Sequence, residues 1–318
     1  MVDQHVAVLL MAYGSPNSLE EVGEYLRQVR EGRPTSEADV ERLRERYRRV
    51  GGRTPLLKIT TAQAVALQRR LKASNTPARV YIGMKHWHPF IEDTVRTIVN
   101  DGAARIVGLA LAPHYSKLSI GGYENAVYQG LEKSKAIPFS MVRDWHTQPH
   151  LINALSNRVR TGLQQSENPS NAAVLFTAHS LPKRFVSAND PYESQLRETS
   201  RLVAVQGGAK DWDFAFQSAG EPSASWLGPM IKEKITELRE RGLRELLVCP
   251  IGFVSDHLEI LFDLDIEARE YGLSLGMRVS RTSSLNDDPE FIEAIAETVR
   301  PLLPRPTGES IGVLSSLP

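Results

Sequence analysis

Short apolar runs alternate along the chain with longer segments in which apolar and polar residues recur at helical spacing. Runs flanked by turn residues are typical of strands buried on both faces, and the amphipathic segments between them are typical of crossover helices. The pattern therefore predicts an α/β fold with parallel sheets. Strands are expected at VAVLLMAYG, ARVYIGMKHW, ARIVGLALAPHYS, AAVLFTAHSLP, DFAFQSAG and ELLVCPIGFVS.

The two halves of the chain repeat one plan. LLMAYGSP in the first half and LFTAHSLP in the second each end a strand with a ring-bearing polar residue, a small residue and a nearby proline. We infer a duplication and predict two similar Rossmann-like domains, each a parallel sheet flanked by helices. The first is expected at residues 1–148 and the second at 149–308, followed by a flexible tail at 309–318.

The composition is that of an ordinary globular protein. The 318 residues are 41% hydrophobic and 24% charged with no net charge, so no positive field would draw the chain to nucleic acid. No run approaches the roughly 18 apolar residues of a membrane span, and the first residues lack the cationic start of a signal peptide. We expect a cytoplasmic monomer without stable membrane insertion. The single cysteine, Cys249, argues against internal disulfides and cysteine-ligated clusters.

Residues capable of chemistry gather where the predicted strands end. Ligands of open parallel sheets bind beyond the carboxyl ends of the strands, so these side chains should converge on a cleft between the domains. No glycine-rich nucleotide motif follows any of the strands, so a nucleotide cofactor has no support. The strand ends carry Tyr13 and Gly14, His114 and Tyr115, His179 and Ser180, Gln217 and Ser218, and Asp256 and His257.

The segment GFVSDHLEILFDLDIE places acidic residues at helical spacing among apolar ones. On an α-helix, Asp256, Glu259, Asp263, Glu267 and Glu270 fall within one narrow arc. Like charges four residues apart destabilise a helix by roughly 0.2–0.5 kcal/mol per pair, which indicates that a cation binds nearby. The alternative is a solvated acidic face, although the apolar arc is wide for a surface helix.

His179 follows a predicted strand of the same half as the acidic segment. Histidine and carboxylates without a thiolate are typical of a loosely held divalent metal. A serine hydrolase that uses His179 and Ser180 is disfavoured, because the chain has no G-x-S-x-G elbow.

Other histidines and arginines are candidates for contact with a substrate. His86 and His88 would share one face of a strand, where packing or substrate contact is favoured over metal binding. The sequence leaves open whether they, or His114, contact the substrate. Arginines near turns could hold substrate carboxylates bidentately, and the candidates are Arg30, Arg46 and Arg53.

Seven motifs, in order along nearly the whole chain, resemble the ferrochelatase family, in particular its compact Gram-positive type. They are LLMAYGSP, GGRTPL, YIGMKHWHPFIEDTV, LAPHYS, TAHSLP, FQSAGEPSASWLGP and PIGFVSDHLEILFDLDIE. The resemblance implies two Rossmann-like domains around a porphyrin cleft. It also implies that Fe²⁺ is inserted into coproporphyrin III, with release of two protons, in haem biosynthesis.

The resemblance further implies roles for individual residues. His179 and Glu259 would form the inner metal site and accept protons, and Asp263 and Glu267 would form an outer acidic site. The outer acids could deliver iron, bind Mg²⁺ or only tune the local field. Tyr13 would be the axial ligand of iron in the product. The positions that would contact the tetrapyrrole are Tyr13, Arg30, Arg46, Tyr47, Thr54 and Tyr123.

Three departures from the family pattern refine this expectation. Thr54 stands where a serine is usual, which keeps the hydroxyl group. The tail TGESIGVLSSLP has no cysteine, so the iron–sulfur cluster of some members is not expected. The lip PTSEADVERLRE is polar, which with the arginines favours the four-carboxylate coproporphyrin III over protoporphyrin IX.

Several alternatives stay open. They are a protoporphyrin IX ferrochelatase, a cobalt or nickel chelatase of another tetrapyrrole, and a two-domain protein that binds metal or haem without turnover. Other enzymes of the haem pathway are potential partners.

Overall fold

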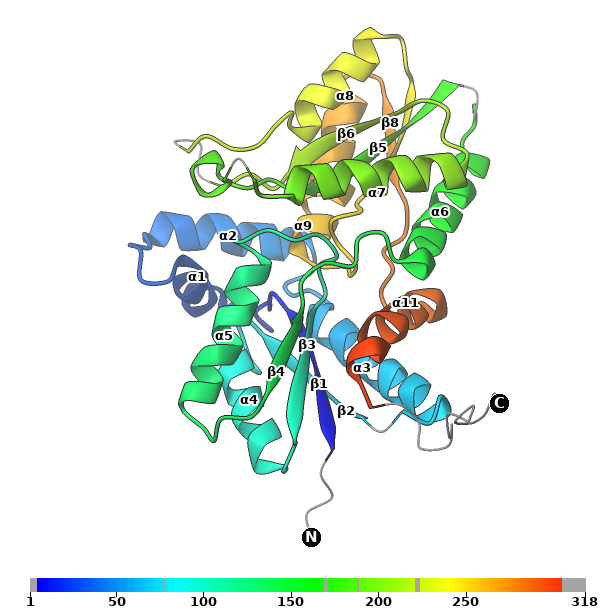
Figure 1. The fold of residues 1–318 in the computed structure, drawn as a ribbon. Helices are drawn as coiled ribbons and strands as arrows, with labels where there is room; N and C mark the ends of the chain where they lie inside the picture. The colour runs from blue at the N-terminus through cyan, green and yellow to red at the C-terminus, as the bar shows by residue number, and fades with distance from the viewer. Residues whose placement is uncertain (1–4, 77, 169–170, 188, 221–223, 305–318) are drawn as a thin grey trace, which may run out of the picture.

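The computed structural model describes residues 5–76, 78–168, 171–187, 189–220 and 224–304. It contains two four-stranded parallel sheets, one in each half of the chain (Figure 1). The predicted fold class, with two Rossmann-like sheets flanked by helices, is confirmed. The first sheet has the order β2-β1-β3-β4, from β1 (Val6–Ala12), β2 (Ala78–Met84), β3 (Arg105–Ala110) and β4 (Phe139–Val142). The second has the order β6-β5-β7-β8, from β5 (Ala172–His179), β6 (Trp212–Gln217), β7 (Glu245–Cys249) and β8 (Arg278–Arg281).

The two sheets share one topology, because the first strand of each half lies inside its sheet and the next strand forms an edge. Every residue of β1 is buried, as expected for an apolar strand covered on both faces. The carboxyl ends of β1 and β5 are therefore held in a rigid core, and they carry Tyr13 and His179.

Helices cover both sheets. The first half contains α1 (Val22–Arg30), α2 (Glu37–Arg49), α3 (Leu56–Ala73), α4 (Ile91–Asn100) and α5 (Ile120–Glu132). The second contains α6 (Pro149–Gln164), α7 (Tyr192–Gly207), α8 (Ile231–Glu240), α9 (Leu258–Leu261), α10 (Arg269–Ser274) and α11 (Pro289–Val299). Short 3₁₀ turns occur at Lys183–Phe185 and Arg300–Leu302.

The last helix returns to the first half of the molecule. α11 packs against α3 as well as α6 (Figure 1), and Arg70 of α3 forms a bidentate ion pair with Glu293 of α11. The chain leaves the first sheet after Val142 and enters the second at Ala172. The domain boundary at 148/149 stays a prediction, and the tail expected at 309–318 lies outside the described residues.

The structure differs from the expected elements in two respects. Two short edge strands, β4 and β8, were not predicted. The acidic segment was expected to be one α-helix, but α9 gives way to a π-helix, η3 (Asp263–Ala268), which continues into α10. Asp256 precedes α9, so the prediction that it lies on the helical strip is wrong.

Among the described residues, none of the helices combines the length and the apolar character that crossing a membrane requires.

Candidate metal site between the two sheets

His179 and Glu259 face each other at the carboxyl end of the second sheet. His179 ends β5, Glu259 lies in the first turn of α9, and the distance from His179 Nε2 to Glu259 Oε1 is 3.5 Å. The Nδ1–H of His179 donates to the carbonyl oxygen of Ser180. A neutral His179 would therefore present the lone pair of Nε2 toward the carboxylate. The structure brings together the two residues that the sequence predicts as the inner metal site.

The two groups of this pair shift each other's pKa. Burial disfavours the charged imidazolium, but the Glu259 carboxylate outweighs burial and raises the pKa of His179 to about 9. Burial likewise favours the neutral acid, but charged His179 outweighs it and holds the pKa of Glu259 far below its usual range. In the metal-free protein near pH 7, the proton therefore resides on His179 and the negative charge on Glu259.

A second histidine, His257, contacts the other oxygen of Glu259. Its Nε2 lies 3.7 Å from Oε2, and its Nδ1–H donates to the carbonyl oxygen of Ser255 over 2.9 Å. His257 was noted from the sequence only as a strand-end residue. Its position two residues before Glu259, at the start of α9, is the signal that could have identified it.

The carboxylate of Asp263 is buried and already has two hydrogen-bond partners. Arg46 of α2 donates to one carboxylate oxygen and the hydroxyl of Ser218 donates to the other. Burial, followed by the charges of Glu259 and Glu267, raises the pKa of Asp263 against the opposing effect of Arg46. Arg46 also lies over the ring of Phe262, 4.8 Å from its centroid. The charge of Asp263 is thus balanced by Arg46, a cation from the other half of the chain.

Glu267 lies further along η3 and is more open. Its side chain is 41% exposed, and its nearest cation is Lys232 Nζ at 3.9 Å. Among the residues that the structure describes, no three His, Cys, Asp or Glu side chains are placed to hold one ion together. A divalent ion at His179 and Glu259 would complete its coordination with water or substrate atoms.

Two residues at the carboxyl end of β6, Gln217 and Ser218, position the acidic segment. Gln217 Nε2 donates to the carbonyl oxygen of Glu259 over 2.9 Å, and Ser218 donates to Asp263. Ser218 has a φ of 61°, a left-handed conformation that costs a non-glycine residue energy and is concentrated at functional sites. Neither role could be assigned from the sequence, because both contacts join distant segments.

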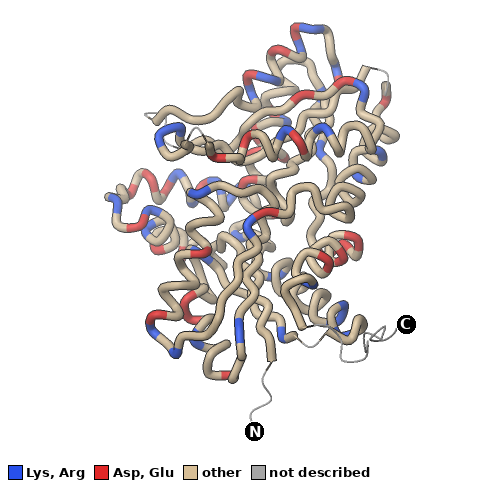
Figure 2. Tube along the Cα trace, viewed as in Figure 1, with Lys and Arg blue, Asp and Glu red and all other residues tan. Residues whose placement is uncertain are grey.

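A capping box fixes the start of α2, the helix that carries Arg46. The hydroxyl of Ser36 accepts from the backbone N–H of Asp39, and the carboxylate of Asp39 accepts from the N–H of Ser36. Asp39 also forms ion pairs with Arg30 and Arg42. Acidic residues lie in the first turn of α2 and arginines in its last turn (Figure 2).

The predicted tetrapyrrole contacts partly cluster in the first half. Ser15 joins two of them, because its hydroxyl lies 3.0 Å from that of Tyr47 and 2.7 Å from that of Thr54. Burial, followed by the charge of Glu259, raises the pKa of Tyr13 and of Tyr123, so both phenols stay protonated. Tyr13 is nevertheless 41% exposed. Arg30 instead donates to the carbonyl oxygen of Pro34 and pairs with Asp39 at 3.1 Å.

The histidines whose role was left open have distinct surroundings. His86 packs against Tyr13 with ring centroids 4.5 Å apart, and burial, followed by the charge of Lys85, lowers the pKa of His86 to about 3. His88 stacks edge-on against Phe90. His114 is buried, and its Nε2 lies 2.9 Å from Thr199 Oγ1 of α7. His86 is thus in ring contact with Tyr13, a predicted substrate contact.

The pKa of His179 offers a test of the pair without substrate. We expect it to be about 9 in the metal-free protein. In Glu259→Gln the main raising charge is gone, so the pKa should fall well below its value in the unchanged protein, because burial is the largest cause acting on His179 and lowers the pKa. A pH titration of the histidine NMR signals measures both values. Equal values in the two proteins would contradict the described geometry.

Three comparisons relate the whole chain to known proteins. The family model described as ferrochelatase matches residues 5–302. A ferrochelatase of Deinococcus radiodurans is 42% identical over 299 residues, covering 92% of this chain and 95% of that protein. A coproporphyrin III ferrochelatase of Halalkalibacterium halodurans is 36% identical over 303 residues, covering 94% of this chain and 98% of that protein. The sirohydrochlorin chelatase SirB from Bacillus subtilis subspecies spizizenii shares the fold at a TM-score of 0.56 and 13% identity, over 93% of this chain and 94% of that one.

Proposed function

The chain belongs to the ferrochelatase family, and from this premise we propose that it inserts Fe²⁺ into coproporphyrin III and releases two protons. The protein is a metal chelatase of haem biosynthesis, with Fe²⁺ as its substrate metal and a tetrapyrrole as its organic substrate. The observation that carries the proposal is the His179–Glu259 pair, which places a proton acceptor and an anionic ligand 3.5 Å apart.

The pair can couple metal arrival to proton removal. In the metal-free state His179 holds a proton because Glu259 is charged. A cation that binds Glu259 competes for this charge, so it lowers the pKa of His179 and releases the proton. The freed Nε2 lone pair can then accept one pyrrole proton, and the Glu259 carboxylate, once the ion has left this weak oxygen ligand, can accept the second.

The remaining predicted residues have proposed roles around this step. We assign Tyr13, which is protonated and partly exposed, as the axial ligand of the product iron. Tyr47, Thr54 and Tyr123 would line the tetrapyrrole site, and Arg30 and Arg46 would bind its carboxylates.

The outer acids have separate proposed roles. Glu267 is the exposed acid at which we place Mg²⁺ or incoming iron, since hard cations bind exposed carboxylates and keep several waters. Asp263 would act after its ion pair with Arg46 opens. We also propose that the enzyme carries no cysteine-ligated cluster, since its single cysteine is buried in β7.

Coproporphyrin III is the proposed tetrapyrrole for two reasons. Several relatives that are 36% identical over 94% of this chain are coproporphyrin III ferrochelatases. The last turns of α1 and α2 also carry arginines, namely Arg27, Arg30, Arg46, Arg48 and Arg49, and arginines suit a substrate with four carboxylates better than one with two.

A competition assay tests this choice. With equal concentrations of coproporphyrin III and protoporphyrin IX and limiting anaerobic Fe²⁺, we expect coproporphyrin to be metallated about 10-fold faster, as measured by chromatography of the products. Arg30→Met should reduce this preference about 10-fold, because a hydrogen bond to a charged group contributes about 1.5–3 kcal/mol.

Arg42→Met is the matched control. Both arginines pair with Asp39, but only Arg30 is assigned to the substrate. Equal losses in the two variants would contradict the role of Arg30. A preference for protoporphyrin IX in the unchanged protein would contradict the proposed substrate while leaving the chelatase activity in place.

A further inference from the structure

We propose that Arg281 is a positioning residue for the metal site. It binds one carboxylate at each end of residues 256–265, the segment that carries Glu259 and Asp263. The proposal rests on the function assigned to that segment above. It gives a role to the second sheet's edge strand, which the reaction itself does not use.

Arg281 uses every nitrogen of its guanidinium. Nε and Nη2 donate to the two oxygens of Asp265 over 2.7 and 2.9 Å, and Nη2 also donates to Asp256 Oδ1 over 3.0 Å. Nη1 donates to the carbonyl oxygen of Thr282 over 3.0 Å and lies 3.4 Å from Ser284 Oγ. Its side chain is only 15% exposed. A planar fork with this many partners can adopt only one orientation.

The segment between the two carboxylates needs such support. α9 has only four residues, and η3 is a π-helix, in which the N–H of Glu267 bonds to the carbonyl of Phe262. π-Helices are rare and occur mostly as single turns at functional sites. Residues two apart on a helix point to different sides, so Asp265 reaches Arg281 while Asp263 reaches Arg46 and Ser218. Arg281 therefore binds the side of the helical segment that lies opposite Asp263.

The two ends of the segment are not equally secured. Asp256 also accepts from Ser284 over 2.7 Å and from Asn286 over 2.9 Å. Gln63 of α3 in turn donates to the carbonyl of Asn286 over 2.7 Å. Within the part of the chain that the structure describes, the Asp265 carboxylate has Arg281 as its only side-chain hydrogen-bond partner. Loss of Arg281 should therefore release the Asp265 end and shift Glu259 and Asp263.

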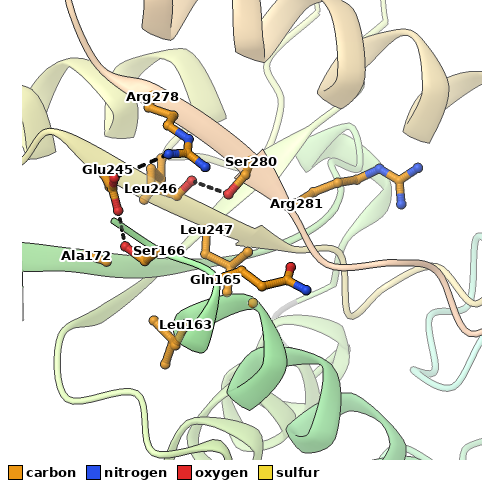
Figure 3. Close-up of a pocket in the computed structure, with 11 residues that line it drawn as sticks. Leu163, Gln165, Ser166, Ala172, Glu245, Leu246, Leu247, Arg278, Ser280 and Arg281 are labelled. Atoms are coloured by element: carbon orange, nitrogen blue, oxygen red, sulfur yellow. Dashed lines mark hydrogen bonds and ion pairs between the residues drawn. The ribbon is translucent and has the colours of Figure 1, made fainter. Parts of the chain in front are cut away.

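The same strand offers a matched control in Arg278. Its guanidinium pairs with Glu167 and lies 3.7 Å from Glu245. Figure 3 shows Arg278 turned toward Glu245 at a small pocket of about 90 Å³. Arg281 also lines this pocket, but its guanidinium extends away from Arg278 and Glu245. Ala172, Glu245 and Arg278 line this pocket and begin β5, β7 and β8, so it lies at the opposite end of the sheet from His179.

The test compares Arg281→Met with Arg278→Met. For Arg281→Met we expect the KM for Fe²⁺ to rise and kcat to fall, each about 10-fold or more, since small displacements of reacting groups cost rate steeply. The KM for the porphyrin should change less than about twofold, and Arg278→Met should match the unchanged protein. Calorimetry with cobalt(II) alone provides a second readout, in which Arg281→Met should bind about 10-fold more weakly.

A paired variant separates positioning from charge balance and from misfolding. Arg281→Met combined with Asp265→Asn removes both partners of the bidentate pair, so thermal stability should recover. If metal kinetics also recover, Arg281 only neutralises Asp265 and the proposal is wrong. Equal kinetics and cobalt(II) affinity in Arg281→Met and Arg278→Met would also overturn it. Absence of metallation in the unchanged protein would instead count against the proposed function, and the cobalt(II) measurement would still decide the role of Arg281.

Discussion

Replacing His179 with alanine is expected to slow metal insertion by about 1,000-fold or more while coproporphyrin III still binds. Proton transfer by a positioned side chain contributes about 10²–10⁴-fold to rates. His179 also supplies one of the two proposed ligands at the reacting face, with Nε2 3.5 Å from Glu259. The insertion rate is measured from the absorbance change under anaerobic conditions, and porphyrin binding from the quenching of its fluorescence.

His150→Ala is the control for this variant. His150 lies on α6, where its Nδ1 is 2.8 Å from Glu290 Oε1, in a partly exposed position. It should retain the rate of the unchanged protein. Full activity in His179→Ala would remove His179 from the mechanism, and loss of porphyrin binding would show that it acts in substrate binding instead.

Glu259→Gln is expected to lower the insertion rate by about 100- to 1,000-fold. The substitution keeps the shape but removes the charge that attracts the cation and that raises the pKa of His179. Asp263→Asn should be milder, at about 10-fold, and should act mainly on the dependence of the rate on metal concentration. Asp263 is already neutralised by Arg46, so it contributes less free charge. Initial rates over a range of Fe²⁺ concentrations distinguish the two effects.

Glu270→Gln tests whether removal of any negative charge from the acidic segment is sufficient to slow metal insertion. Glu270 belongs to the same predicted strip but is exposed and pairs with Arg49. It should behave like the unchanged protein. If Asp263→Asn lowered the insertion rate as much as Glu259→Gln, the division into inner and outer acids would be contradicted.

The sequence predicts the buried strands well because their signal is local. Strands such as β1 and β5 are continuous apolar runs, and their ends correctly locate Tyr13 and His179. The edge strands β4 and β8 were missed because each has four residues, FSMV and RVSR, without a long apolar run. These strands are defined by pairing with β3 and β7, which a local pattern does not report.

The acidic segment also shows that a local sequence pattern does not report tertiary contacts. Spacing alone correctly predicted that acids gather on one helical segment, but the change to π-geometry at Asp263 has no clear local signal. The cation expected from the charge pattern is present in the form of Arg46, which lies 217 residues away in the chain. Ser218 and Arg281 also bind the segment through tertiary contacts, with partners 45 and 16 residues away in the chain. These partners follow from the fold and not from any stretch of sequence.

The most direct test of the central claim is a single turnover of the unchanged protein with anaerobic Fe²⁺ and coproporphyrin III. We expect the absorbance spectrum of the metallated porphyrin to appear and two protons to be released for each product formed, as followed with a pH indicator. The same experiment with His179→Ala should show bound but unmetallated porphyrin. Binding of coproporphyrin III without any metallated product from the unchanged protein would contradict the account.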